Sequence, residues 1–152
     1  MTSKKLISVV TPCYNEELNV DELYARIKAV FENEPNYDYE HIFIDNASKD
    51  ATVARVKTLC LKDSRVKLIV NVRNFGHIRS PYHGLLQANG DAVMLMVSDL
   101  QDPPELIPDF LRKWEGGYKV VIGVKAESAE TPLMFAVRKA YYNLIGKISD
   151  IE

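Results

Sequence analysis

Short apolar runs alternate with amphipathic stretches along the whole chain. Each run has four to six residues and is mostly apolar at both alternating positions, which is typical of a strand covered on both faces of its sheet. The runs predict strands at Leu6–Val10, His41–Ile44, Val66–Val70, Ala92–Val97 and Lys119–Gly123.

Helical spacing of apolar residues fills the intervals between these runs. Asn19 and Glu22 form an N-x-x-E capping box at the start of the first predicted helix. Ser48 or Asp50 is predicted to cap the second helix. Later helices are predicted at about Tyr82–Ala88, Pro104–Trp114 and Leu133–Ile145.

Two of these helices have features that affect their placement. Pro81 is expected in or before the first turn of the third helix, and Gly90 is expected to close it. The last helix, Leu133–Ile145, has one apolar face that could pack on the sheet or lie on a membrane or partner surface. Packing on the sheet is the favoured interpretation.

The alternation of predicted strands and helices indicates an α/β fold: a Rossmann-like, mostly parallel sheet with helices on both faces. No repeat, low-complexity segment or Pro/Gly-rich linker divides the sequence, so residues 1–152 are predicted to form a single domain. Ligands of such sheets bind beyond the carboxyl ends of the strands, near the switch in strand order. The loops after the predicted strands are therefore the candidate functional segments.

Composition narrows the class of protein. Apolar residues make up 47% of the 152 residues and charged residues 26%, as in ordinary globular domains. The net charge of −2 argues against a nucleic-acid-binding protein, which needs a strongly basic face. The longest uninterrupted apolar run, Ala92–Val97, is far shorter than the roughly 18 residues of a membrane span. Two distant cysteines favour a reducing compartment, so a cytoplasmic location is expected.

The loop after the first predicted strand, Thr11–Glu17, combines a proline bend, an aromatic ring and acidic side chains. It lacks the glycines that cradle a pyrophosphate, but Tyr14 could stack on a base and Glu16 could hydrogen-bond to a base or sugar. By itself, the loop is equally described as a capped turn with solvated acids, and this is the favoured interpretation of the loop alone.

The loops after the second and third predicted strands are also polar. Asp45 or Asn46 could bond the edge of a base or a ribose hydroxyl, while Ser48 and Asp50 cap the next helix. After the third strand, a basic cluster gives positive charge that would suit a phosphate-bearing ligand, although such clusters are more often solvated surface. The cluster consists of Arg73, His77 and Arg79.

The loop after the fourth predicted strand carries two carboxylates, Asp99 and Asp102. Carboxylates at this position suit Mg²⁺ or Mn²⁺, bound jointly with the phosphates of a substrate. Helix capping before Pro103 and Pro104 explains Asp102 equally well. It does not explain Asp99, which the strand carries directly to the ligand-binding edge.

Five motifs in these loops occur together and in a fixed order. They are Pro12-x-Tyr14-Asn15-Glu16, Asp45-Asn46-Ala47-Ser48-x-Asp50-x-Thr52, Asn74-x-Gly76, Gly90-Asp91-Ala92 and Asp99-Leu100-Gln101-Asp102-Pro103-Pro104-Glu105. In this combination the chain resembles family 2 glycosyltransferases with the GT-A fold. The most similar branch contains dolichyl-phosphate mannose synthases and polyprenyl-phosphate (bactoprenol) glycosyltransferases. The resemblance covers about Leu6 to Glu152, and the Asp-Leu-Gln-Asp-Pro-Pro-Glu run is specific to that branch.

The resemblance implies roles for individual residues. Asp45 and Asn46 correspond to the paired acids that hold the base, with an uncharged amide in place of the second acid. Asp99 corresponds to the second Asp of the D-x-D metal motif and Gln101 to a neighbouring metal ligand, while Asp102 is the nearest candidate base for an alcohol acceptor. The nucleotide-binding first loop corresponds to Pro12, Tyr14 and Glu16.

Two further basic residues complete the implied site. Lys125 stands where the branch usually has an Arg near the donor diphosphate, and it keeps the charge without the bidentate geometry. Arg138 resembles a basic residue on the acceptor side. A larger departure is Val97, which occupies the position of the first D-x-D acid and so weakens the expected metal site. The branch continues beyond the position of Glu152 with a Gly-Asp-Phe-Arg-like segment, so the chain is expected to be truncated at its C-terminus.

The function implied is inverting transfer of a sugar from a UDP- or GDP-sugar to a polyprenyl phosphate or a cell-envelope glycan. Mg²⁺ or Mn²⁺ would be the cofactor, and UDP is the favoured nucleotide. The lipid-phosphate acceptor places the full-length protein at the cytoplasmic face of the membrane. A phosphate acceptor, largely ionised above pH ~6, would need no strong general base.

Three alternatives remain at this point. Because Val97 replaces an acid, the chain could be a degenerate domain that binds a nucleotide-sugar without turnover. A nucleotidyltransferase would be expected to have a glycine-rich, basic first loop, which Thr11–Glu17 is not. A dinucleotide-binding oxidoreductase is disfavoured because no G-x-G-x-x-G follows the first strand.

Overall fold

The computed structural model describes residues 4–124 and 132–148. The chain divides between Tyr118 and Lys119 into two compact units, and each is treated by itself below. None of the described helices is both long enough and apolar enough to cross a membrane.

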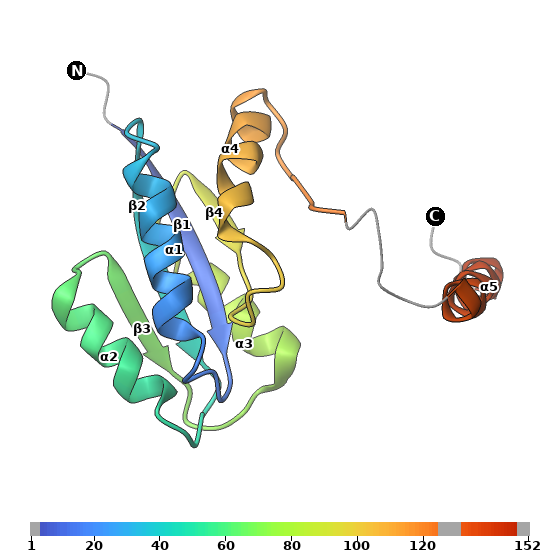
Figure 1. Cartoon of the computed structure of the whole chain (residues 1–152), viewed down its shortest axis with the longest axis horizontal. Helices are drawn as coiled ribbons and strands as arrows, with labels where there is room; N and C mark the ends of the chain where they lie inside the picture. Colours follow the sequence, from blue (N-terminus) through green and yellow to red (C-terminus); the bar gives the residue numbers. More distant parts are fainter. Residues whose placement is uncertain (1–3, 125–131, 149–152) are drawn as a thin grey trace. The chain divides into compact units, whose positions relative to one another are not determined.

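The first unit contains a sheet of parallel strands in the order β3-β2-β1-β4 (Figure 1). The bounds of these strands are β1 Lys5–Cys13, β2 Tyr37–Asp45, β3 Val66–Val70 and β4 Ala92–Leu95. This arrangement confirms the predicted α/β class with a parallel sheet.

Helices lie on both faces of the sheet, and Figure 1 shows α1 in front of it and α3 behind it. One face, carrying Ile7 and Phe43, packs on α1, α2 and α4; the other, carrying Val10, packs on α3. Their bounds are α1 Val20–Glu32, α2 Thr52–Lys62, α3 Gly76–Leu86, the 3₁₀ turn η1 Pro104–Leu106, and α4 Ile107–Glu115.

Strand β2 begins earlier than predicted, at Tyr37 rather than His41. Polar residues alternate with tyrosines in this part, so it does not read as a continuous apolar run. Glu40 is nevertheless buried, because Lys67 and Ser8 both donate hydrogen bonds to its carboxylate. At the other edge, β4 ends at Leu95 rather than Val97.

The predicted capping box at α1 is wrong. Asn19 occupies the N-cap position, but its amide donates to the Glu16 carboxylate at 2.7 Å instead of accepting from the helix. Glu22 lies 3.7 Å from Arg26, one turn later. The bond from Asn19 Nδ2 to the charged carboxylate of Glu16 fixes the side chain in an orientation in which its Oδ1 does not cap the helix.

The predicted caps of α2 also need correction. The N-cap residue is Ala51, and Asp50 accepts the N–H of Thr52 at 3.0 Å. Ser48 instead accepts a hydrogen bond from the N–H of Asn15, in the loop after β1.

Helix α3 starts at Gly76, and Pro81 lies inside it. The prediction of a start near Tyr82 assumed that a proline cannot occupy a helix interior, where it lacks the N–H that bonds to the preceding turn. Close packing compensates here: Ser80, Pro81 and Gly84 are all buried against the sheet.

The predicted fifth strand, Lys119–Gly123, is not formed. Residues 119–124 have no regular structure, and Val120, Ile122 and Val124 are exposed. A strand needs a neighbour to satisfy its backbone groups, and no described strand pairs with this segment. The second unit also contains α5, Pro132–Ile148, which confirms the predicted last helix.

Candidate functional site

The carboxyl edge of the sheet contains the topological switch point. The chain passes from β1 to β2 and β3 on one side, and α3 then returns it to β4 on the other side of β1. The neighbouring strands β1 and β4 therefore both end at this edge, where ligands of open α/β sheets bind. Ser98, after β4, donates its hydroxyl to the carbonyl of Pro12 at 3.2 Å and joins the loop after β4 to the last residues of β1.

The loops after β1 and β2 are joined by hydrogen bonds that each link a backbone N–H of one loop to a side chain of the other. We call these the interloop hydrogen bonds. They are Asn15 N–H to Ser48 Oγ (2.8 Å), Lys49 N–H to Asn15 Oδ1 (2.9 Å), Glu16 N–H to Thr52 Oγ1 (2.8 Å), Glu17 N–H to Asp50 Oδ2 (3.1 Å) and Ala51 N–H to Glu17 Oε2 (2.8 Å).

Tyr14 projects from this fixed frame. Its side chain is 45% exposed, whereas Pro12 before it is partly buried and bonded through its carbonyl to Ser98. A half-exposed aromatic ring on an immobilised loop presents a face on which a base could stack. Glu16 is held in the same loop by the amide of Asn19.

Asp45, at the end of β2, is almost completely buried, with 1% of its surface exposed. Its Oδ2 accepts the N–H of Ser48 at 3.0 Å. Its Oδ1 has no hydrogen-bond partner in the part of the chain that the structure describes. A buried carboxylate oxygen without a donor is costly, so Oδ1 of Asp45 is an unsatisfied acceptor at the carboxyl end of β2.

Asn46, the next residue, is fully engaged. Its Nδ2 donates to Asn74 Oδ1 at 2.9 Å and to the Gly76 carbonyl at 3.3 Å. Its Oδ1 accepts from the Phe75 N–H at 2.9 Å and from Asn71 Nδ2 at 3.3 Å. Both donors and both acceptor positions of the amide are used. The contact with a base that the sequence predicts for Asn46 would therefore require one of these bonds to break.

Asp99 and Gln101 lie in the loop after β4 and are exposed, as is Asp102. Asp99 Oδ1 accepts the N–H of Gln101 at 3.1 Å. Among the described residues no three His, Cys, Asp or Glu side chains gather around a possible metal position. The carboxylate of Asp99 and the amide oxygen of Gln101 are oxygen donors of the kind that Mg²⁺ and Mn²⁺ prefer.

Three non-glycine residues with positive φ mark these loops. They are Asn15 (φ 59°), Ala47 (φ 65°) and Leu100 (φ 59°), one after each of β1, β2 and β4. Left-handed backbone is unfavourable for residues with a Cβ, most of all for bulky ones. Such strain concentrates at functional sites, where the surrounding contacts maintain it.

Two residues at this edge were not identified by sequence reasoning. Ser98 ends an apolar run, so its position at the strand end was a usable signal. Cys13, behind the loop, is buried; burial raises the pKa of its thiol well above the ordinary value, and the negative charge of Asp45 raises it further. Cys13 is therefore a protonated packing residue and not a nucleophile.

Two of the predicted site residues lie outside the first unit, Met1–Tyr118. Lys125 lies outside the described residues. Arg138 lies on α5 in the second unit, with its guanidinium 5.7 Å from the centre of the Phe135 ring. The roles predicted for both stay predictions.

Residues 8–147 match the model of a protein family described as glycosyl transferase family 2. The chain belongs to this family. Among curated relatives of this family 2 member, the uncharacterized glycosyltransferase YkcC of Bacillus subtilis is 38% identical over 95% of the chain and 45% of the relative. The bactoprenol glucosyl transferase of Shigella phage SfV is 36% identical over 94% of the chain and 47% of the relative. The chain thus spans about half the length of the curated relatives it matches.

Solved structures agree with the fold of this family 2 member. The mannosyltransferase PcManGT of Pyrobaculum calidifontis, solved with GDP-Man and Mn²⁺, matches with a TM-score of 0.61 at 22% identity, over 74% of the chain and 33% of that protein. The TarS 1–349 fragment of S. aureus, solved with UDP, matches with a TM-score of 0.59 at 24% identity, over 85% of the chain and 38% of that fragment. The fold is the GT-A fold of glycosyltransferases, as the sequence predicts.

Proposed function

We propose that the chain carries the donor site of an inverting glycosyltransferase. The full-length protein would transfer a sugar from a nucleoside diphosphate sugar, preferably a UDP-sugar, to a polyprenyl phosphate. The observation that carries this proposal is the Ser98–Pro12 hydrogen bond at the switch point, which joins the residue before the exposed Asp99 to the strand end that leads into Tyr14. The name of the bactoprenol glucosyl transferase relative supports the acceptor class.

In this proposal, different residues bind the base and the diphosphate of the donor. Tyr14 would stack on the base, and the free Oδ1 of Asp45 would accept a hydrogen bond from it. Asp99, with Gln101 beside it, would hold a divalent ion together with the donor diphosphate, and that ion supplies positive charge to the leaving group. In the transfer, the acceptor oxygen bonds to the anomeric carbon as the carbon–oxygen bond to the diphosphate breaks on the opposite side.

A phosphate acceptor removes the need for a strong base in this scheme. A phosphate monoester loses its second proton near pH ~6, so its oxygen is already a nucleophile at neutral pH. An alcohol on a cell-envelope glycan would need a base, for which Asp102 is the candidate at this edge.

Calorimetric titration of the chain with UDP and GDP, with and without Mn²⁺, tests the donor site. We expect Mn²⁺-dependent binding, weakened by Asp99→Asn and by Asp45→Asn. Asp38→Asn is the matched control, because Asp38 is an exposed carboxylate near the amino end of β2 and its loss should leave binding unchanged. Failure of both nucleotides to bind under every metal condition would refute the donor site.

A second candidate is a domain that binds a nucleotide-sugar without transferring the sugar. Val97 favours it, because a half-exposed valine stands where an additional metal-binding acid is expected. Transfer of a radiolabelled sugar to polyprenyl phosphate by the full-length protein distinguishes the two. Transfer that Asp99→Ala abolishes supports the enzyme, whereas nucleotide binding with no transfer supports the binding domain.

A further inference from the structure

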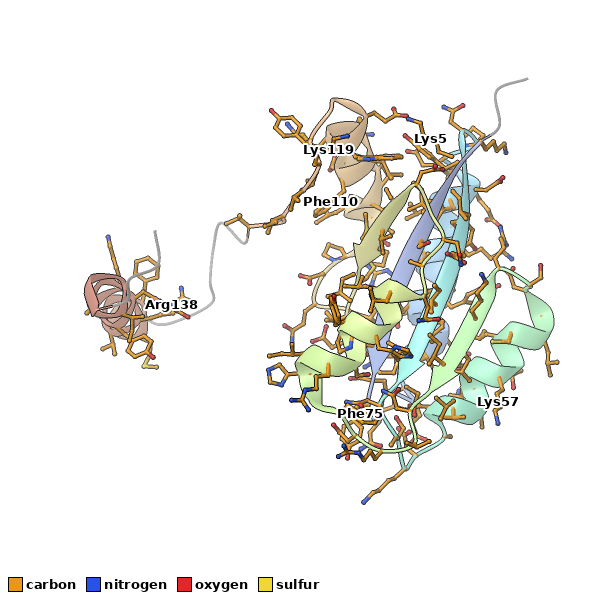
Figure 2. All side chains as sticks on the ribbon, turned by 180° about the vertical axis from the view of Figure 1, so that it is seen from behind. Lys5, Lys57, Phe75, Phe110, Lys119 and Arg138 are labelled. Atoms are coloured by element: carbon orange, nitrogen blue, oxygen red, sulfur yellow. The ribbon has the colours of Figure 1, made fainter. Side chains whose placement is uncertain are left out.

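Helix α3 carries three large apolar side chains on its outer side, while Leu85 packs against the sheet. Ile78, Tyr82 and Leu86 are 72%, 61% and 62% exposed, whereas the residues it buries are Ser80, Pro81 and Gly84. Positions 78, 82 and 86 are each one turn apart, so they form a single stripe along the helix. We call these three residues the α3 stripe. Figure 2, seen from behind, shows α3 on the near face of the sheet with Phe75 at its beginning.

Close packing on the sheet explains this reversed arrangement. A Cβ on Gly84 would lie 2.9 Å from both Ile44 Cγ2 and Val10 Cγ1, so the helix approaches the sheet as nearly as its backbone allows. Small residues are required around Gly84, and the one larger apolar side chain of α3 that packs against Val10, Ile42 and Ile44 among the described residues is Leu85. The α3 stripe is therefore not part of the core of the first unit.

The surroundings of the α3 stripe are basic. Arg79 and His83 alternate with the stripe residues on the same side of the helix, and His77 and Arg73 precede them; all four are exposed. The sequence contains no Asp or Glu from Val66 to Gly90, although the chain has 21 acidic residues.

These basic side chains are not neutralised within the first unit. None of them takes part in an ion pair with another described residue. Arg73 stacks its guanidinium over the Phe75 ring, 4.5 Å from the centre, which leaves the charge in place. The acid buried on the sheet face that α3 covers, Glu40, is itself bonded to Lys67.

We propose that the α3 stripe and its basic neighbours form a docking surface for an anionic lipid bilayer. Aliphatic side chains insert at the boundary of headgroups and acyl chains, and tyrosine is favoured at headgroup level. Arginines beside them attract anionic headgroups. An anionic bilayer matches both the apolar side chains and the uncompensated positive charge.

The inference deepens the proposed function, since a polyprenyl phosphate acceptor is embedded in a bilayer. Its test measures lipid binding, while the donor site is tested by nucleotide binding, so either can fail without the other.

Co-sedimentation of the chain with phosphatidylcholine vesicles, with and without phosphatidylglycerol, tests the docking surface. We expect binding only to the vesicles that contain phosphatidylglycerol, and weaker binding at high salt because the charges are screened. Arg79→Glu, and separately the pair Ile78→Ser and Leu86→Ser, should each lower vesicle affinity about tenfold. All these positions are exposed, so the variants should keep the circular dichroism spectrum of the parent chain.

Helix α2 provides matched controls on another surface. Lys57→Glu repeats the charge reversal at an exposed residue, and Leu61→Ser removes an apolar side chain that is 89% exposed. Both should bind vesicles as the parent chain does. The proposal is overturned if the chain ignores anionic vesicles, or if the α3 variants bind as the α2 controls do. Loss of self-association in the α3 variants without loss of lipid binding would assign the α3 stripe to a second copy of the chain instead.

Discussion

The amide of Asn46 donates to Asn74 Oδ1 at 2.9 Å and ties the end of β2 to the loop before α3. Asn74 Oδ1 also accepts the N–H of Gly76, the first residue of α3. The side chain of Asn46 thus positions the start of α3 through Asn74. Asn46 directly follows Asp45, whose Oδ1 has no hydrogen-bond partner among the described residues. Although Asn46 stands where the family resemblance implies an acid, only an amide can make this pattern, because an ionised carboxylate donates nothing.

Replacing Asn46 by Asp should therefore destabilise the protein. Two donated hydrogen bonds are lost, and the carbonyl of Gly76 and Oδ1 of Asn74 then face a negative charge. We expect a loss of about 1–3 kcal/mol in the free energy of unfolding, measured by urea denaturation, with faster hydrogen exchange at the Phe75 and Gly76 amides. Asn33→Asp removes one exposed hydrogen bond, from the Asn33 side-chain amide to the carbonyl of Ala29, and should lower the free energy of unfolding by less. Equal losses of stability in the two variants would mean that the hydrogen bonds of Asn46 stabilise the fold no more than the single exposed bond of Asn33 does.

Replacing Ala47 by Gly should stabilise the protein. Ala47 has a φ of 65°, a conformation that costs an L-residue about 1–2 kcal/mol and costs glycine little. Glycine also loses more conformational entropy on folding, which offsets part of this gain. We therefore expect the free energy of unfolding, measured in a thermal or urea melt, to rise by about 0.5 kcal/mol. The same change at Ala54, exposed inside α2, should cost about 1 kcal/mol. A loss at both positions would contradict the strain argument.

His41 should make stability depend on pH. It is buried and shares a hydrogen bond with Thr11 Oγ1, and burial lowers its pKa from 6.5 to about 3. Below pH 6.5 the unfolded chain binds a proton that the folded chain does not, so the free energy of unfolding should fall as the pH drops from about 6.5 to about 3. The slope from this residue approaches about 1.4 kcal/mol per pH unit.

His41→Gln removes this titration, so urea melts across the range should show a shallower slope for the variant. His83→Gln is the control, because the exposed His83 side chain is hydrated in both states; it should keep the parent slope. A parent slope retained in His41→Gln would assign the pH dependence to other groups.

Gly90→Ala should be strongly destabilising. A Cβ at Gly90 would lie 2.7 Å from the backbone N and the Oγ of Ser8, and 2.8 Å from the carbonyl of Ala92. The backbone N–H of Gly90 also donates a hydrogen bond to Ser8 Oγ at 2.9 Å. Overpacking costs about 1–3 kcal/mol, and the upper end is expected because backbone atoms cannot move aside. Gly116→Ala, whose nearest contact would be 3.2 Å, should lose less; the reverse order in denaturation midpoints would count against this packing.

The sequence predicts the elements that are apolar and locally self-consistent. The predicted bounds of β3, Val66–Val70, agree with the structure because the adjoining residues, Arg65 and Asn71, are charged and polar. The first half of β2 was missed because Glu40 is buried through side-chain partners from other strands, which no local pattern reveals. The interior proline of α3 was missed for a similar reason: its cost is offset by contacts with the sheet.

The candidate site shows the same limit. Its residue types and strand-end positions were predicted, since parallel strands bring their carboxyl ends to one edge. Asp45 and Asn46 are neighbours, but they differ in hydrogen bonding. Oδ1 of Asp45 has no partner among the described residues, whereas the Asn46 amide bonds to Asn71 and Asn74. Those partners are distant in sequence, and only the folded chain shows which of the two polar side chains is available.

The interloop hydrogen bonds have a consequence for protein engineering. Each one matches a backbone group of one loop to a side chain of the other, so the shape of either loop is encoded partly in its neighbour. A chimera that imports residues 14–19 alone would lose the acceptors Asn15 Oδ1 and Glu17 Oε2 and misplace the rest. Loops grafted between relatives should be transplanted as a pair, with residues 46–52 moved in the same step.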